Sequence, residues 1–122
     1  HVPDREHVLE IGSVGMTEQE ATEAGHDPLV GEFPFYASGR ALTTGDSEGF
    51  VRVVADSDGT ILGARVVGSE ASELIAELTL AIQQGLSLDA VAETIHAHPT
   101  LSEATMEAAE NALGKAIHTL NR

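Results

Sequence analysis

The chain has 122 residues, the length of one domain, and 42% of them are hydrophobic, which is enough for a buried core. Its 20 acidic residues outnumber 6 basic ones and give a formal net charge of −14, which argues against nucleic-acid and anionic-membrane partners. The chain has no cysteine, so it contains no disulfide, thiolate metal site or cysteine nucleophile. No apolar run is long enough to span a membrane and no signal peptide is visible, so we predict a cytoplasmic protein.

The carboxylates are spread along the chain rather than gathered in one block. This distribution indicates an acidic surface in contact with water, not a disordered acidic tail. Mutual repulsion of like charges destabilises a compact state at low ionic strength, and salt screens it. We therefore predict a salt-adapted, halophilic protein.

The first third of the chain predicts short strands around one capped helix. Residues 10–16 have the pattern of an extended segment. Thr17 and Glu20 have the spacing of a capping box, and Gly25 supplies a stop, so a short helix is expected over 17–24. Residues 29–36 predict a strand that Pro34 shifts toward a sheet edge or a bend, and residues 37–48 predict a loop or short helical turns.

The clearest strand signal is a pair of β-branched runs at 49–55 and 60–67. They flank the turn sequence Asp56-Ser57-Asp58-Gly59, in which the glycine suits a positive φ. We predict an antiparallel hairpin here. With the helices expected further along, the fold class is α+β, with an antiparallel sheet flanked by helices.

The second half of the chain predicts three helices. An apolar stripe from Ala71 to Ile82 indicates the first, with Ser69 or Ser72 as its cap. Ser87 is expected to cap a short second helix. A third runs from a second capping box to about residue 120, and its alanine stripe, weakened at Thr105, would let another helix approach closely.

The second capping box also carries the candidate chemistry. If Thr100 is the N-cap, the Glu103 side chain leans back toward the entering chain, where His98 lies. The carboxylate would hold one imidazole nitrogen as a donor and leave the other as a base. The alternative is a helix cap with no catalytic role. His96 and His98 lack an evident third ligand, so we expect no metal site, and His96 is expected to end the preceding helix.

Several segments in fixed order carry a resemblance. The run HAHPTLSEA (96–104) resembles the C-terminal active-site segment of the dihydrolipoamide dehydrogenases. The runs SVGMTEQEA (13–21), SGRAL (38–42), GFVRVVAD (49–56) and ILGARVVGSEASELI (61–75) resemble the dimerisation domain of the wider pyridine nucleotide–disulfide oxidoreductase family. The chain departs from the family's Thr-x-Pro-Glu pattern just before the first strand, where His7 and Leu9 replace the Thr and the Pro.

The resemblance implies that residues 1–122 are a single dimerisation domain, and that the FAD- and NAD-binding domains lie outside this chain. It implies that His98 enters the partner subunit's active site, that Glu103 orients it, and that His98 and Pro99 lie beside the partner's flavin. FAD and NAD would serve the full-length enzyme and would not bind this chain alone. The isolated chain would therefore be inactive.

The implied activity is NAD-dependent oxidation of dihydrolipoamide by a homodimer. Its substrate would be a lipoyl domain, and a 2-oxo acid dehydrogenase complex is a possible larger partner. Two alternatives stay open at this point. One is the same domain of a glutathione-type reductase, and the other is a stand-alone dimerisation module without catalysis.

Overall fold

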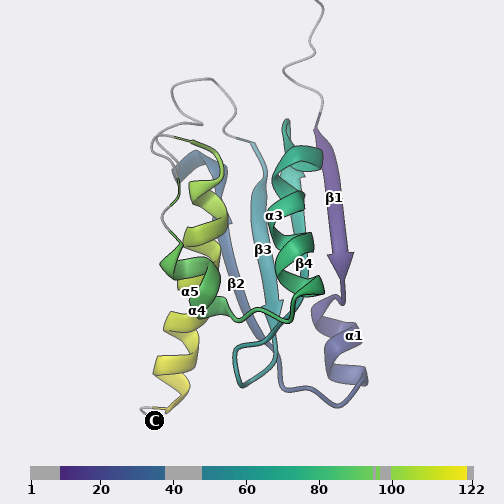
Figure 1. The fold of residues 1–122 in the computed structure, drawn as a ribbon, viewed down its shortest axis with the longest axis vertical. Coiled ribbons are helices and arrows are strands. Elements are labelled where there is room, and N and C mark those ends of the chain that lie inside the picture. Colours follow the sequence, from purple (N-terminus) through teal and green to yellow (C-terminus); the bar gives the residue numbers. More distant parts are fainter. Residues whose placement is uncertain (1–8, 38–47, 95, 97–99, 121–122) are drawn as a thin grey trace, which may run out of the picture.

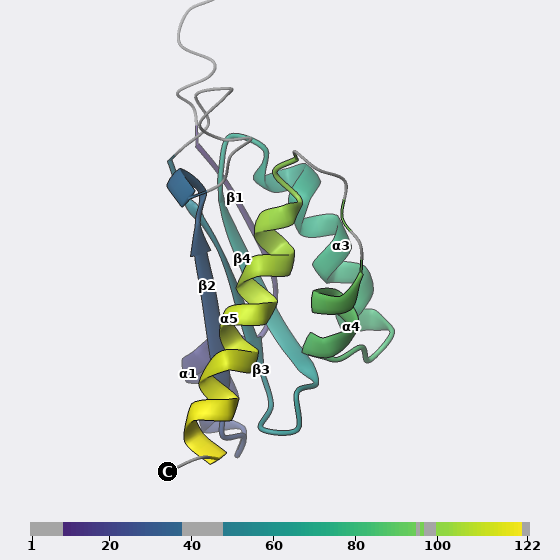
Figure 2. The same ribbon diagram turned by 90° about the vertical axis from the view of Figure 1, so that its left-hand side faces the viewer.

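The computed structural model describes residues 9–37, 48–94, 96 and 100–120, with side chains as far as residue 114. The described elements form two layers, a four-stranded antiparallel sheet and a layer of helices on one of its faces (Figures 1 and 2). The predicted α+β class is therefore confirmed. In the described part of the chain, no helix is long and apolar enough to cross a membrane.

The sheet has the strand order β1-β4-β3-β2. Its strands are β1 (Glu10–Gly15), β2 (Leu29–Pro34), β3 (Phe50–Ala55) and β4 (Ile61–Gly68). The β3–β4 hairpin is confirmed, with Gly59 at φ +93° in its turn. The strand that Pro34 ends lies at an edge, as predicted, but residues 35–37 form a 3₁₀ turn, η2 (Phe35–Ala37), instead of extending it.

Helix α1 (Glu18–Glu23) begins with the predicted capping box. The Thr17 N–H donates to Glu20 Oε1 at 3.0 Å, and the Glu20 N–H donates to Thr17 Oγ1 at 3.1 Å. Both partners are local, so the spacing alone was sufficient to predict the helix start.

Helix α3 (Ala71–Gln83) begins differently from the prediction. Its N-cap is Glu70, which makes no side-chain cap bond, so the predicted serine cap is wrong. The carboxylate of Glu10, on β1, accepts from both the Oγ and the backbone N–H of Ser72, at 2.7 and 3.1 Å. An acceptor 62 residues away in sequence therefore satisfies a donor in the first turn of α3.

Helices α4 (Leu88–Glu93) and α5 (Glu103–Leu120) complete the layer. Ser87 caps α4 as predicted, accepting from the Ala90 N–H at 3.4 Å. Helix α5 begins at Glu103, not directly after Thr100, because a tighter turn of i to i+3 bonds precedes it.

The core lies between the sheet and the three helices α3, α4 and α5. Its largest fully buried side chains are Phe35, Leu78, Leu88, Val51, Val53, Val66 and Thr105. Helix α5 lies along β2 and against α4. At Gly31 on β2, an added Cβ would overlap the Ala108 carbonyl oxygen and the Ala112 nitrogen. The alanine face of α5 thus allows close approach to a strand, which the prediction of a helix partner missed.

The other face of the sheet is not covered by α3, α4 or α5, and α1 lies only at one end of it (Figure 2). Arg52 and Arg65 are direct cross-strand neighbours on this face. Arg52 also donates to Glu32 Oε1 at 2.9 Å. Ile11, on the same face, is 62% exposed, so apolar surface remains in contact with water there.

Candidate functional site

The predicted site lies where the chain passes from α4 to α5. His98 and Pro99 lie outside the described residues, and so does Arg40 of the SGRAL run. The predicted contact between His98 and Glu103 therefore stays a prediction. The residues on either side of this short stretch, His96 and Thr100, are described, as is Glu103.

Glu103 occupies the position that the capping argument gave it. Its Oε1 accepts from the Thr100 N–H at 3.1 Å, so the carboxylate reaches back over the chain that enters α5. Thr100 Oγ1 also lies 2.8 Å from Ser102 Oγ, which further fixes this turn. The carboxylate is thus held by its own helix start, on the side from which the predicted His98 arrives.

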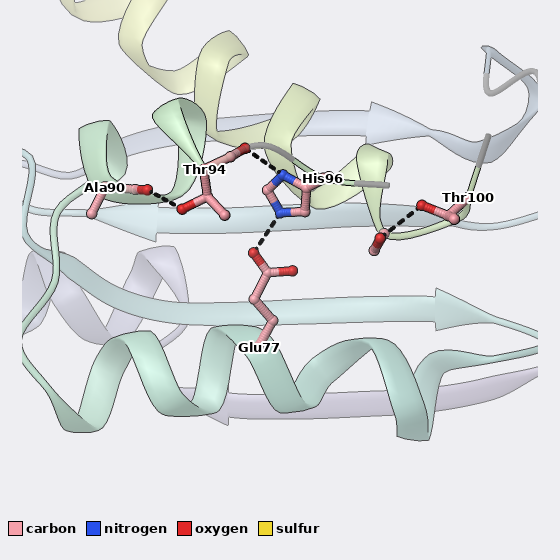
Figure 3. Close-up of polar contacts among 6 residues, drawn as sticks. Glu77, Ala90, Thr94, His96 and Thr100 are labelled. Carbon is pink, nitrogen blue, oxygen red and sulfur yellow. Dashed lines mark hydrogen bonds and ion pairs between the residues drawn. The ribbon is translucent and has the colours of Figure 1, made fainter. Parts of the chain in front are cut away.

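His96 makes a contact that the sequence reasoning missed. Its Nε2 lies 2.6 Å from Glu77 Oε2, and its side chain is only 5% exposed. Glu77 comes from α3, and its carboxylate and the imidazole point toward one another across the space between the helices (Figure 3). The two residues are 19 apart in sequence, so no local spacing rule connects them.

The second ring nitrogen of His96 is also occupied. Nδ1 lies 2.8 Å from the carbonyl oxygen of Thr94, the residue that ends α4. The expectation that His96 ends this helix is thus met in part, because His96 lies beyond the end but contacts its last carbonyl. Since a carbonyl can only accept, Nδ1 carries a hydrogen, and one further proton is shared between Nε2 and the Glu77 carboxylate.

A groove adjoins this pair. It has a cavity volume of about 430 Å³ and lies among α3, α4 and the turn before α5. Its lining is mostly apolar and includes Leu80, Leu86 and Val91, together with both members of the Glu77–His96 pair. The pair therefore lies at the border between the helix layer and solvent.

The described carboxylates on α5 repel one another. Burial raises the pKa of Glu107, and the charges of Glu110 and Glu103 raise it further. On the other side of the molecule, the pKa of Glu10 is lowered by the hydrogen bonds from the Ser72 hydroxyl and backbone N–H. Among the described residues, no group of three or more His, Asp or Glu side chains could hold a metal ion.

Comparison with known proteins identifies the family. The model of the pyridine nucleotide-disulphide oxidoreductase dimerisation domain matches residues 7–109. The chain belongs to this family. The family resemblance drawn from the sequence is therefore confirmed.

Curated relatives of this family member are dihydrolipoyl dehydrogenases. That of Haloferax volcanii is 69% identical over 114 residues, which cover 93% of this chain and 24% of the relative. That of Geobacillus stearothermophilus is 51% identical, with the same shares of 93% and 24%. The chain thus spans about a quarter of the length of these relatives.

Solved structures share the fold. The HOCl-induced flavoprotein disulfide reductase RclA of Escherichia coli matches with a TM-score of 0.77 at 27% identity, over 84% of this chain and 26% of that one. LpdA of Mycobacterium tuberculosis matches with a TM-score of 0.76 at 26% identity, over 86% of this chain and 25% of that one.

Proposed function

We propose that this chain is the dimerisation domain of a dihydrolipoyl dehydrogenase, and that it supplies the acid–base residues His98 and Glu103 to dithiol oxidation. The identity of 69% to the Haloferax volcanii enzyme supports the assignment within the family. The observation that carries the site is the hydrogen bond from the Thr100 N–H to Glu103 Oε1, at 3.1 Å. It directs the carboxylate toward the chain that leads from His98 into α5.

The chemistry of a dithiol requires such a pair. The thiolate is the nucleophile in thiol–disulfide exchange, and a free thiol is mostly protonated near neutral pH. His98 would take the thiol proton, and the thiolate would attack a disulfide that lies outside this chain in the complete protein. As the new S–S bond forms and the old one breaks, His98 would return the proton to the sulfur that leaves. Glu103 would hold the other imidazole nitrogen and stabilise the imidazolium.

The cofactors belong to the complete polypeptide in this proposal. FAD, when bound, would accept the electron pair released by the dithiol, and NAD⁺ would be the final acceptor. His98 and Pro99 would line the flavin site of the partner subunit. The isolated chain would be inactive because it has no redox cysteine of its own.

The proposal includes a homodimer. The family description supports it, as do the exposed apolar side chains Leu9 and Ile11, which are 43% and 62% exposed. In the complete protein we expect this surface to be covered by protein. The substrate would be the dihydrolipoyl group of a lipoyl domain, in a cytoplasmic 2-oxo acid dehydrogenase complex.

Substitution in the complete protein tests the acid–base assignment. His98→Gln should slow dithiol oxidation by roughly 10²-fold to 10⁴-fold, the range that general bases contribute. Glu103→Gln should slow it less, because it removes the orienting group and not the base. An unchanged rate of dithiol oxidation in His98→Gln would show that His98 is not the base.

Substrate comparison separates the two alternatives. A dihydrolipoyl dehydrogenase oxidises dihydrolipoamide with NAD⁺, whereas a glutathione-type reductase turns over a glutathione-like disulfide. A non-catalytic module would do neither, and the Thr100–Glu103 bond would then be a helix cap alone. Steady-state rates with both substrates decide among the three.

The net charge of −14 supports a salt-dependent form of this enzyme. Relatives from the halophilic archaea Haloferax volcanii and Halobacterium salinarum, at 69% and 68% identity, point the same way. Screening of acidic repulsion predicts that native circular dichroism is lost on dialysis to very low salt. A full native signal under those conditions would contradict salt adaptation.

A further inference from the structure

We propose that Glu77 and His96 form a positioning pair, which fixes from α3 the chain that carries His98. This inference rests on the proposed function, because it gives the pair a role in proton transfer by His98. It starts from the observation that the stretch 97–99 is only three residues long and is bounded by two fixed points. Those points are His96 on one side and Thr100 on the other.

The contacts of His96 fix its ring in both directions. Nδ1 is held at 2.8 Å by the Thr94 carbonyl at the end of α4, and Nε2 is held at 2.6 Å by Glu77 of α3 (Figure 3). A ring with both nitrogens bonded has lost its freedom to rotate about χ2. The imidazole is only 5% exposed, whereas the Glu77 side chain is 33% exposed, so the contact is shielded from water on the histidine side and reached by solvent on the glutamate side.

The same contacts exclude His96 as the base itself. A base needs a free ring nitrogen that faces its substrate, and both nitrogens of His96 already face protein oxygens. The sequence HAHP offers two histidines, and with His96 excluded we assign the proton transfer to His98. His96 then acts through the chain and not on the thiol.

The far end of the stretch is fixed by the other glutamate. Glu103 accepts from the Thr100 N–H at 3.1 Å, so carboxylates of two different helices hold the two ends. Three residues extend over about 10 Å at most, so a shift at His96 is passed on to His98. A misplacement of about 1 Å at a reacting group can lower a rate by up to about 10²-fold.

The test uses the complete enzyme and two half-reactions. Reduction of the enzyme by dihydrolipoamide needs the thiol proton to be removed, whereas reduction by NADH does not. Glu77→Ala should slow the dihydrolipoamide half-reaction by roughly 10-fold and leave the NADH half-reaction unchanged. Glu77→Gln should keep most of the rate, because its amide can donate to Nε2 of a neutral imidazole.

Glu10→Ala is the matched control. Like Glu77→Ala, it removes a carboxylate that anchors a contact with α3. The Glu10 carboxylate, however, accepts from Ser72 at the start of α3 and not from His96. We expect it to lower the thermal midpoint without slowing the dihydrolipoamide half-reaction selectively. If Glu77→Ala behaves like Glu10→Ala, or slows both half-reactions alike, the pair is structural only and the inference is overturned.

A double variant tests whether the pair acts through His98. In a His98→Gln background the base is already missing, so adding Glu77→Ala should cause no further loss of rate. An additional 10-fold loss would overturn the inference, since it would show an independent role. If Glu77→Ala does not fold, Glu77→Asp replaces it, because it withdraws the carboxylate by about 1.5 Å and should also slow only the dithiol half-reaction.

The single variants separate the inference from the proposed function. If His98→Gln does not slow the dihydrolipoamide half-reaction, the proposed function fails and the inference falls with it. If His98→Gln slows it and Glu77→Ala does not, the proposed function stands and only the inference is refuted.

Discussion

The contact between β2 and α5 allows a quantitative prediction for Gly31→Ala. The added Cβ would overlap two backbone atoms of α5 and lie 2.7 Å from Ala112 Cβ. Ordinary carbon contacts are about 3.5–4.0 Å long, so α5 must move away by roughly 1 Å. Backbone atoms cannot rotate out of the way as a flexible side chain would.

The displacement has two costs. Overpacking a close contact costs about 1–3 kcal/mol. The movement also stretches the bond from the Glu32 N–H to Asn111 Oδ1, which is 3.1 Å long and joins the same two elements, at a cost of about 1 kcal/mol. The sum is about 3 kcal/mol. At an unfolding entropy of about 2.1 cal/mol/K per residue, it lowers the midpoint of a chain this long by roughly 12 °C.

Thermal unfolding of the 122-residue chain in high salt, followed by circular dichroism, measures this shift. Gly114→Ala is the control, because it adds the same methyl group to the same helix at a position where no atom of the described residues lies within 4 Å. It should raise the midpoint by roughly 4 °C, since alanine favours a helix over glycine by about 1 kcal/mol. Equal midpoints for Gly31→Ala and the parent would refute the close approach of α5 to β2.

Three further predictions concern single side chains. Thr105→Val should raise stability by about 1 kcal/mol in chemical unfolding, because Thr105 is fully buried and its hydroxyl has no partner in the described part of the chain; a loss of stability would reveal a missing partner. Glu10 has a lowered pKa, so its contribution to folding stability is present above the ordinary glutamate pKa and is lost as the pH falls through the lowered pKa. Glu10→Gln should remove this dependence of the thermal midpoint on acid. Glu107 has a raised pKa, so the stability that its protonation adds is present below the ordinary glutamate pKa and is lost as the pH rises through the raised pKa. Glu107→Gln should therefore be more stable than the parent at neutral pH and equally stable in acid. A variant that is less stable than the parent at neutral pH would contradict the raised pKa.

The sequence predicted best what depends on neighbours along the chain. The Thr17–Glu20 capping box, the Ser87 cap and the hairpin turn at Gly59 each need only residues within a few positions. Pro34 limited its strand to an edge for an equally local reason, since proline cannot donate to a second neighbouring strand. These features were correct because their partners were visible in the pattern itself.

The features that were missed all depend on partners that the fold brings together. The serine cap of α3 was replaced by Glu10, whose carboxylate arrives from β1. The alanine stripe of α5 meets Gly31 of a strand, a contact that an apolar pattern cannot distinguish from helix packing. A glycine in the middle of a predicted strand was the available signal, because it marks a close approach of another backbone.

The candidate site combines both kinds of information. Glu103 and Thr100 form a local pair, so the sequence placed the carboxylate correctly relative to the start of α5. Glu77 and His96 form a distant pair, which only the packing of α3 beside the end of α4 creates. A sequence analysis could therefore propose His98 as the base, but it could not find the Glu77–His96 contact. If both glutamates act on the stretch between them, Glu103→Gln and Glu77→Ala should each slow dithiol oxidation, and the two effects should be less than additive because they share one base.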